Sequence, residues 1–150
     1  MSNRLAPFEF PAPVPSDPMM QVRPLSWRST RRAFAVALRG LWEVWLREPH
    51  LRLHTYAGAC VIAAGHWCRL SRMEWLWIAF AIGLVLFAEL MNTAIERTVD
   101  LAVGLRPDPL ARHIKDVAAG CVLVSVAIAV IIGLVTFVPY IATPVSGLAR

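Results

Sequence analysis

The clearest apolar segment of this chain extends from Val117 to Val138, where 22 consecutive residues carry no charged side chain. A helix of about 20 apolar residues matches the thickness of the hydrocarbon core of a bilayer. With 57% hydrophobic residues over 150 positions, the chain is also too apolar for an ordinary soluble domain of this size. The sequence therefore predicts an all-α membrane protein.

Two shorter apolar runs predict two further transmembrane helices. The first lies within Leu51 to Leu70; its uncharged part is short for a bilayer, so the span must begin at Arg52 and His54, whose side chains reach back to the interface. The second begins at Trp75 and is long enough only when the polar segment that follows it is included. We therefore expect three transmembrane helices.

The segment Ser26 to Glu48 has the pattern of an amphipathic helix. Its apolar residues recur at helical spacing, and charged residues lie on the other side: Phe34, Ala37, Leu38, Leu41 and Trp45 against Arg28, Arg32, Arg39, Glu43 and Arg47. This pattern predicts a helix that lies in the plane of the membrane interface. The alternative is a soluble amphipathic helix packed on a core. Pro49 ends the element because proline cannot continue the hydrogen-bond ladder.

The N-terminal segment is rich in proline, with six of the eleven prolines between Met1 and Pro24. No helical or strand period survives such spacing, so we expect a disordered tail over residues 1–25. One membrane domain is expected over residues 26–142, followed by a short tail over residues 143–150.

The distribution of basic residues predicts the orientation of the chain. Eight arginines, from Arg4 to Arg52, lie before or at the start of the first span, and four basic residues lie between the second and third spans. The first loop contains only Arg69 and Arg72, and the C-terminal tail only Arg150. By the positive-inside rule, the N-terminus and the second loop lie in the cytoplasm. The net charge of +5 favours contact with anionic headgroups or phosphates. No basic cluster interleaved with aromatic residues indicates nucleic acid.

A polar stripe follows the second apolar run and continues the same helix. At about 100° per residue, Glu89, Asn92, Glu96 and Asp100 fall within an arc of roughly 80°. Carboxylates at a membrane boundary are costly to desolvate, so they require a cation, a proton or a partner. Mg²⁺ prefers oxygen ligands and meets this need. The alternative is a helix that leaves the bilayer with a solvated acidic face.

Further polar groups are expected at the same boundary: Glu48, the loop from Gly104 to His113, and Lys115 with Asp116. Three small helices cannot bury all of these groups within one chain, which predicts an oligomer. Lys115 can hold phosphate as a charge partner, although ordinary basic flanking of a span also explains it. No glycine-rich nucleotide fingerprint is present, so any ATP would have to be held by metal-bridged carboxylates and basic side chains.

The order of these residues resembles a known family. The string Glu89-x-x-Asn92-Thr-Ala-Ile-Glu96-x-x-Val-Asp100, followed by Lys115-Asp116-x-Ala-Ala-Gly120, is similar to the prokaryotic diacylglycerol kinases, which include the undecaprenol kinases. The likeness extends to Glu48-Pro-x-Leu-Arg52-Leu-His54 and covers roughly Arg31 to Tyr140.

The resemblance implies a small homotrimer in the bacterial inner (cytoplasmic) membrane. Each subunit would have one amphipathic surface helix and three transmembrane helices, with active sites shared between neighbouring subunits. The implied reaction transfers the γ-phosphoryl group of ATP to a lipid alcohol, with Mg²⁺ as the cofactor. ATP, the lipid substrate and the bilayer are the implied partners.

The resemblance also implies roles for individual residues. Glu89 would be the general base that takes the proton of the lipid hydroxyl, and Glu48 and Glu96 would ligate the metal. The implied substrate- and nucleotide-binding residues are Asn92, which positions the reacting groups, Asp100, which supports the site, and Lys115 and Asp116, which contact the nucleotide.

The motifs indicate the type of reaction but leave two candidates for the acceptor lipid. The strings around His54 and Lys115 look more like those of undecaprenol kinases, and His54 stands where enterobacterial diacylglycerol kinases have a glutamate. Both diacylglycerol and undecaprenol stay open. An alternative from another class is a non-catalytic membrane assembly or regulatory protein that keeps the fold; the intact set of polar residues argues against it.

Overall fold

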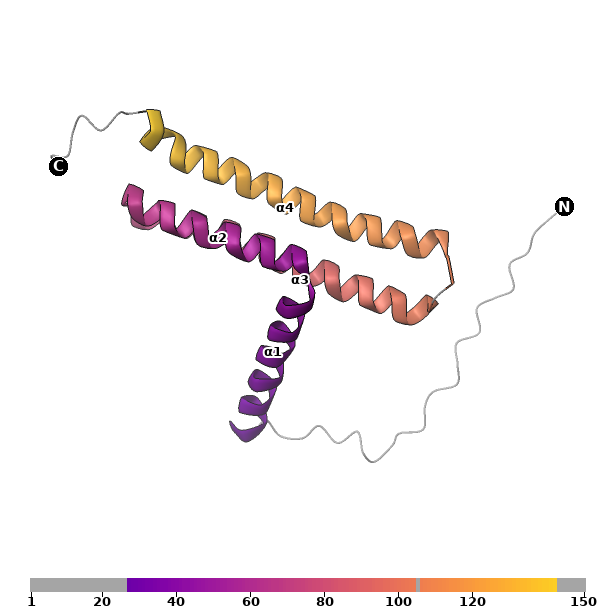
Figure 1. Cartoon of the computed structure of the whole chain (residues 1–150). Helices are drawn as coiled ribbons and strands as arrows, with labels where there is room; N and C mark the ends of the chain where they lie inside the picture. The colour runs from indigo at the N-terminus through magenta and orange to yellow at the C-terminus, as the bar shows by residue number, and fades with distance from the viewer. Residues whose placement is uncertain (1–26, 105, 143–150) are drawn as a thin grey trace, which may run out of the picture. The chain divides into compact units, whose positions relative to one another are not determined.

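The computed structural model describes residues 27–104 and 106–142, which form four helices and their connections (Figure 1). The helices are α1 (Trp27–Arg47), α2 (Pro49–Cys68), α3 (Arg72–Val103) and α4 (Pro109–Ala142). No strand occurs among the described residues, so the all-α prediction is confirmed. The predicted tails, residues 1–25 and 143–150, lie outside the described part of the chain.

Local sequence signals set where the helices begin and end. Glu48 has extended backbone and Pro49 takes the first helical position of α2, where a missing N–H has no consequence. Ser71 starts α3 with a capping box: its hydroxyl accepts a hydrogen bond from the Glu74 backbone, and its own N–H donates to the Glu74 carboxylate. α3 ends at Gly104, whose φ of 62° favours glycine.

The connection between α3 and α4 is shorter than the sequence predicted. The expected loop ran from Gly104 to His113, but α4 already begins at Pro109. The side chain of Asp108 accepts a hydrogen bond of 2.9 Å from the backbone N–H of Ala111, which caps the helix. Because Asp108 caps α4 and the helix begins at Pro109, Lys115 and Asp116 lie on the second turn of α4.

α3 is the element against which the others pack. It lies antiparallel to α4 along much of its length and also contacts α2 (Figure 1). Tyr140, near the end of α4, donates a hydrogen bond to the carboxylate of Glu74 at the start of α3. Lys115 pairs with Asp100 at the other end. These two contacts fix the register of the antiparallel pair.

The face by which α3 packs changes from apolar to polar along the helix. Its buried residues are Ile78, Ala81, Val85, Glu89 and Thr93, at intervals of three and four positions. This spacing corresponds to one helical face, and Glu96 and Asp100 follow on it. The polar stripe is therefore the continuation of the buried face of α3.

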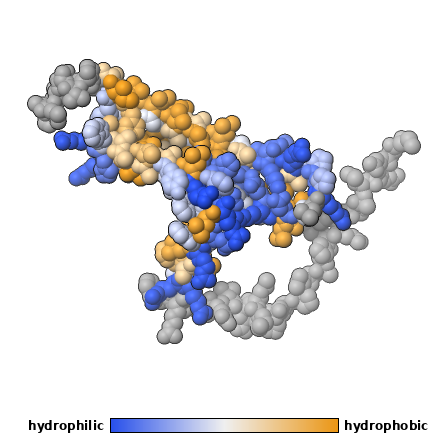
Figure 2. Space-filling view, in the orientation of Figure 1, coloured by the Kyte–Doolittle hydropathy of each residue, from blue (hydrophilic) through white to orange (hydrophobic). Residues whose placement is uncertain are grey.

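Two of the described helices, α3 and α4, are long and apolar enough to cross a membrane; α2 is not among them. Most of the apolar surface of α4 points outward, with Leu123 and Val135 each 72% exposed. Figure 2 shows apolar side chains between two hydrophilic ends of the α3–α4 pair. Exposed apolar surface of this extent needs lipid or another protein surface to cover it. The third span stays a prediction.

Gly65 provides a test of the packing between α2 and α3. A Cβ atom at this position would lie 2.9 Å from Cη2 of Trp75 and 3.0 Å from Cδ1 of Leu70. We expect Gly65→Val to lower the free energy of unfolding by about 1–3 kcal/mol, because neither side chain can move away freely. Gly40→Val is the matched control, since a Cβ there meets nothing within 4 Å. Thermal unfolding in detergent compares the two variants; equal melting temperatures would contradict this packing.

Candidate active site

Four polar contacts follow one another along α3 at the polar end of its buried face. In order they are His54–Glu89, Asn92–Glu96, Glu48–Arg97 and Lys115–Asp100. We refer to these eight residues as the polar ladder. Because a helix rises 1.5 Å per residue, the part of the ladder from Glu89 to Asp100 extends over about 16 Å. The structure thus brings the predicted residues into one elongated site.

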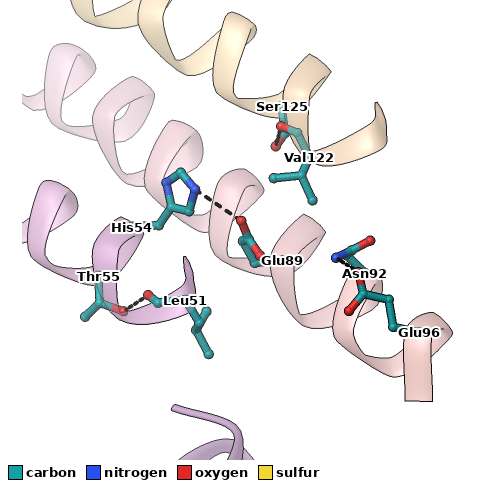
Figure 3. Close-up of polar contacts among 8 residues, drawn as sticks. All are labelled: Leu51, His54, Thr55, Glu89, Asn92, Glu96, Val122 and Ser125. Atoms are coloured by element: carbon teal, nitrogen blue, oxygen red, sulfur yellow. Dashed lines mark hydrogen bonds and ion pairs between the residues drawn. The ribbon is translucent and has the colours of Figure 1, made fainter. Parts of the chain in front are cut away.

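Glu89 occupies the most buried position of the polar ladder. It is 7% exposed and lies on α3 one turn beyond Val85. Its Oε1 atom is 3.1 Å from Nε2 of His54 on α2, and Figure 3 shows the two side chains pointing toward one another. A carboxylate removed from water to this extent requires a hydrogen-bond donor or a positive charge. His54 lies within ion-pair distance of this carboxylate, a role that the sequence reasoning did not assign to it.

Asn92 and Glu96 are linked within α3 (Figure 3). Nδ2 of Asn92 donates a hydrogen bond of 3.0 Å to Oε1 of Glu96. Oδ1 of Asn92 is buried, and no partner within the described residues satisfies it. A buried acceptor without a donor costs about 1–3 kcal/mol. Asn92 also lines an apolar pocket of about 400 Å³ between α3 and α4, together with Met91, Cys121 and Ser125.

Glu48 comes to α3 from the junction of α1 and α2. Its Oε1 atom is 3.0 Å from a guanidinium nitrogen of Arg97, which follows Glu96 in the sequence. Both side chains are partly exposed, so the pair adds little stability. Its consequence is to attach Glu48, at the start of α2, to α3 next to the polar stripe.

The last step of the polar ladder borders a pocket at the turn between α3 and α4. Lys115 pairs with Asp100, and both line a pocket of about 560 Å³. The other charged residues that line it are Arg106, Asp108, Arg112 and Asp116. The three basic side chains of this pocket are balanced by three aspartates, and Lys115 is paired with Asp100. Within it, the two arginines have the side chain that binds phosphate through paired hydrogen bonds.

The predicted metal ligands lie in the site but do not form a closed cage. Among the described residues, no group of three or more histidine, cysteine, aspartate or glutamate side chains could hold a metal ion. Glu48 contacts Arg97, and Glu96 contacts Asn92. Each carboxylate of the polar stripe therefore has its own protein partner. Since Mg²⁺ is commonly held by one or two carboxylates with substrate phosphates, the metal assignment stays a prediction.

Sequence reasoning missed two members of the polar ladder. Arg97 gave no signal, because its partner Glu48 is 49 positions away and arginines are common beside a membrane span. His54 was noted as an interfacial side chain and as a difference from the enterobacterial pattern, but not as a partner of Glu89. Its distance from Glu89 becomes visible only when α2 and α3 are placed side by side.

Comparison with known proteins places the chain in a family. The sequence model described as prokaryotic diacylglycerol kinase matches residues 35–137. An undecaprenol kinase of Bacillus subtilis is 43% identical over 108 residues, which cover 72% of this chain and 87% of that protein. A diacylglycerol kinase of Synechocystis is 38% identical over 67% of this chain and 58% of its own length. A diacylglycerol kinase of Escherichia coli is 26% identical over 67% of this chain and 81% of its own length.

The fold and these comparisons first define a class: a bacterial membrane protein with a polar site at one end of its apolar helices. The chain belongs to the prokaryotic diacylglycerol kinase family, and it is a lipid kinase. This confirms the resemblance seen in the sequence. Nothing in the comparisons supports the non-catalytic alternative.

The unpaired oxygen of Asn92 predicts that one substitution will lower kinase turnover without lowering thermal stability. Asn92→Leu removes a buried acceptor that has no donor, and it also removes the Nδ2 donor to the partly buried Glu96. We expect these two effects to offset, so the melting temperature in detergent should stay near that of the unmodified protein. Kinase turnover should fall by about tenfold or more, because the site loses a positioned polar group. Ser125→Ala is the control: its hydroxyl donates only to Val122 within α4, and it lines the same apolar pocket. Full turnover in Asn92→Leu would show that Asn92 has no role in the reaction.

Proposed function

We propose that this protein transfers the γ-phosphoryl group of ATP to the hydroxyl of a membrane lipid, either diacylglycerol or undecaprenol. The products would be phosphatidic acid or undecaprenyl phosphate. The observation that carries the proposal is the polarity gradient of the polar ladder. Its Glu89 end is buried and continues the apolar face of α3, and its Asp100 end borders a charged pocket at the helix turn.

Glu89 is proposed as the general base. It lies at the apolar end of the ladder, the end that a hydroxyl at headgroup depth would reach. As the lipid oxygen bonds to the γ-phosphorus, the hydroxyl proton passes to the Glu89 carboxylate and the bond between phosphorus and the ADP oxygen breaks. ADP departs with that electron pair, and Glu89 later returns its proton to water. Such transfer depends mostly on positioning and charge neutralisation.

Glu48 and Glu96 are proposed to hold Mg²⁺. Both present hard carboxylate oxygens, and Glu96 lies next to the unpaired Oδ1 of Asn92, so the donor set suits this ion. When bound with the nucleotide, Mg²⁺ would neutralise phosphate charge. Asn92 would then orient the reacting groups through its free oxygen.

The nucleotide is proposed to lie toward the turn between α3 and α4. Lys115 and Asp116 line the charged pocket there, and Asp100 holds the Lys115 ammonium by an ion pair. Arg106 and Arg112 line the same pocket and add positive charge for phosphate. The γ-phosphoryl group would thus lie between the nucleotide end and the Glu89 end of the ladder.

The proposed assembly is a homotrimer in the bacterial inner membrane, with α2 as a third span and the N-terminus in the cytoplasm. The outward apolar surface of α4 and the unpaired oxygen of Asn92 support contact with further copies. The concentration of arginines before α2 supports the orientation. In this arrangement the polar ladder lies on the cytoplasmic side, where ATP is present.

We favour undecaprenol as the acceptor. The undecaprenol kinase of Bacillus subtilis shares 43% of matched residues with this chain, against 26% for the diacylglycerol kinase of Escherichia coli. The histidine at position 54 also departs from the glutamate of the enterobacterial enzymes. The diacylglycerol kinase of Synechocystis, at 38% identity, keeps diacylglycerol as the second candidate.

The proposed base is tested by Glu89→Gln, which keeps the shape of the side chain and removes its ability to accept a proton. We expect kcat to fall by about 10²- to 10⁴-fold with folding and assembly unchanged. Glu74→Gln is the control, because Glu74 lies at the opposite end of α3 and caps that helix. Near-wild-type turnover in Glu89→Gln would contradict the assignment of Glu89 as the general base.

The acceptor is tested by offering diacylglycerol and undecaprenol in parallel in mixed micelles with γ-labelled ATP and Mg²⁺. We expect label in a lipid phosphate, with a higher kcat/KM for undecaprenol. A higher kcat/KM for diacylglycerol would reverse the preference. Label in neither lipid, from folded protein, would contradict the proposed function.

A further inference from the structure

The contact between His54 and Glu89 joins α2 to α3 at the deepest point of the polar ladder (Figure 3). Nε2 of His54 lies 3.1 Å from Oε1 of Glu89; the side chains are 22% and 9% exposed, respectively. The two residues come from different helices and lie far apart in the sequence. Their contact is therefore a product of tertiary packing rather than of local helix geometry.

His54 borders an apolar pocket. His54 lines a pocket of about 270 Å³ whose other walls come from α2, α3 and α4. The wall residues from α4 are Val126, Ala129, Val130, Gly133 and Phe137, none of which ionises. Along α2 and α3, the nearest charged positions in sequence are Arg52, toward the start of α2, and Glu96, two turns along α3. Among the described residues, His54 is the ion-pair partner of Glu89.

We propose that His54 is a positioning residue that orients the carboxylate of Glu89 for proton abstraction. This inference rests on the proposed function, in which Glu89 is the base. At the observed distance an N–H at Nε2 of His54 would donate to Oε1, and both the neutral Nε2–H tautomer and the imidazolium carry that N–H. With Oε1 engaged, the carboxylate is held in one orientation and Oε2 is left to face the lipid hydroxyl.

In the transfer step, the hydroxyl proton moves to Oε2 of Glu89 while the lipid oxygen bonds to phosphorus and ADP leaves. His54 keeps its own proton and touches neither substrate. Its contribution is geometric, since a base must point at the proton it removes. Misplacement of a reacting group by about 1 Å can cost a hundredfold in rate. A donor fixed by the packing of α2 on α3 prevents such misplacement.

A merely structural role for His54 makes a different prediction. An apolar side chain of similar size would fill the same space between the helices, and a structural role would then show itself in stability alone. A positioning role should appear in kcat, depend on the presence of Glu89, and be rescued by another side chain that can donate a hydrogen bond.

The test uses His54→Met and His54→Gln, two side chains of similar length of which only glutamine donates. We expect His54→Met to lower kcat by about 10- to 100-fold, with KM for ATP and for lipid changed less than about threefold. His54→Gln should retain most of the turnover. In a Glu89→Gln background, His54→Met should cause no further loss, because the group that it positions is already disabled.

One control and one replacement variant accompany these two substitutions. His50→Leu alters an exposed histidine one turn earlier on α2 and should leave turnover unchanged. If His54→Met does not fold in detergent, His54→Asn replaces it, because its amide is too short to reach Oε1 and should show the same loss of kcat.

The outcomes separate the two hypotheses. Wild-type kcat in folded His54→Met, equal losses for methionine and glutamine, or a full additional loss in the Glu89→Gln background would each overturn the positioning role. Wild-type turnover in Glu89→Gln alone would overturn the proposed base, and this inference with it. A large loss in Glu89→Gln with full activity in His54→Met would overturn only the inference.

Discussion

The carboxylate of Glu89, buried on the face by which α3 packs, is the constraint on which the rest of the structure depends. A charge in that position is costly without a partner, and the partner is His54 on α2. The same requirement recurs along the helix, where Glu96 is bonded by Asn92 and Asp100 is paired with Lys115. Satisfying these groups in turn brings α2, α3 and α4 together at one polar end.

The arrangement suits a reaction between a lipid and a nucleotide. An ordinary soluble active site gathers its groups around one point, whereas the polar ladder extends over about 16 Å along α3. Its buried end continues an apolar helix face, and its exposed end borders a charged pocket. A lipid kinase must bring substrates of opposite polarity together, and a helix that leaves the apolar region offers both environments on one continuous face.

Much of the fold could be predicted from periodicity and from proline positions. The four helices occur where apolar runs and caps indicated them, and the face shared by Glu89, Asn92, Glu96 and Asp100 followed from the helical repeat. The start of α4 was misplaced, because a loop rich in glycine, proline and charge hides the cap at Asp108. Whether α2 spans the membrane depends on the surroundings of its polar residues, which hydropathy alone does not describe.

The sequence by itself determined the membrane class, the family and the face on which the acidic residues lie, because these depend on composition, order and a local repeat. Only the tertiary structure decided which partner each acidic residue receives. His54 reaches Glu89 from another helix, and Arg97 reaches Glu48 across 49 positions. Such pairings depend on how helices are placed in space, and no short-range pattern encodes a distance between side chains that lie far apart in the chain.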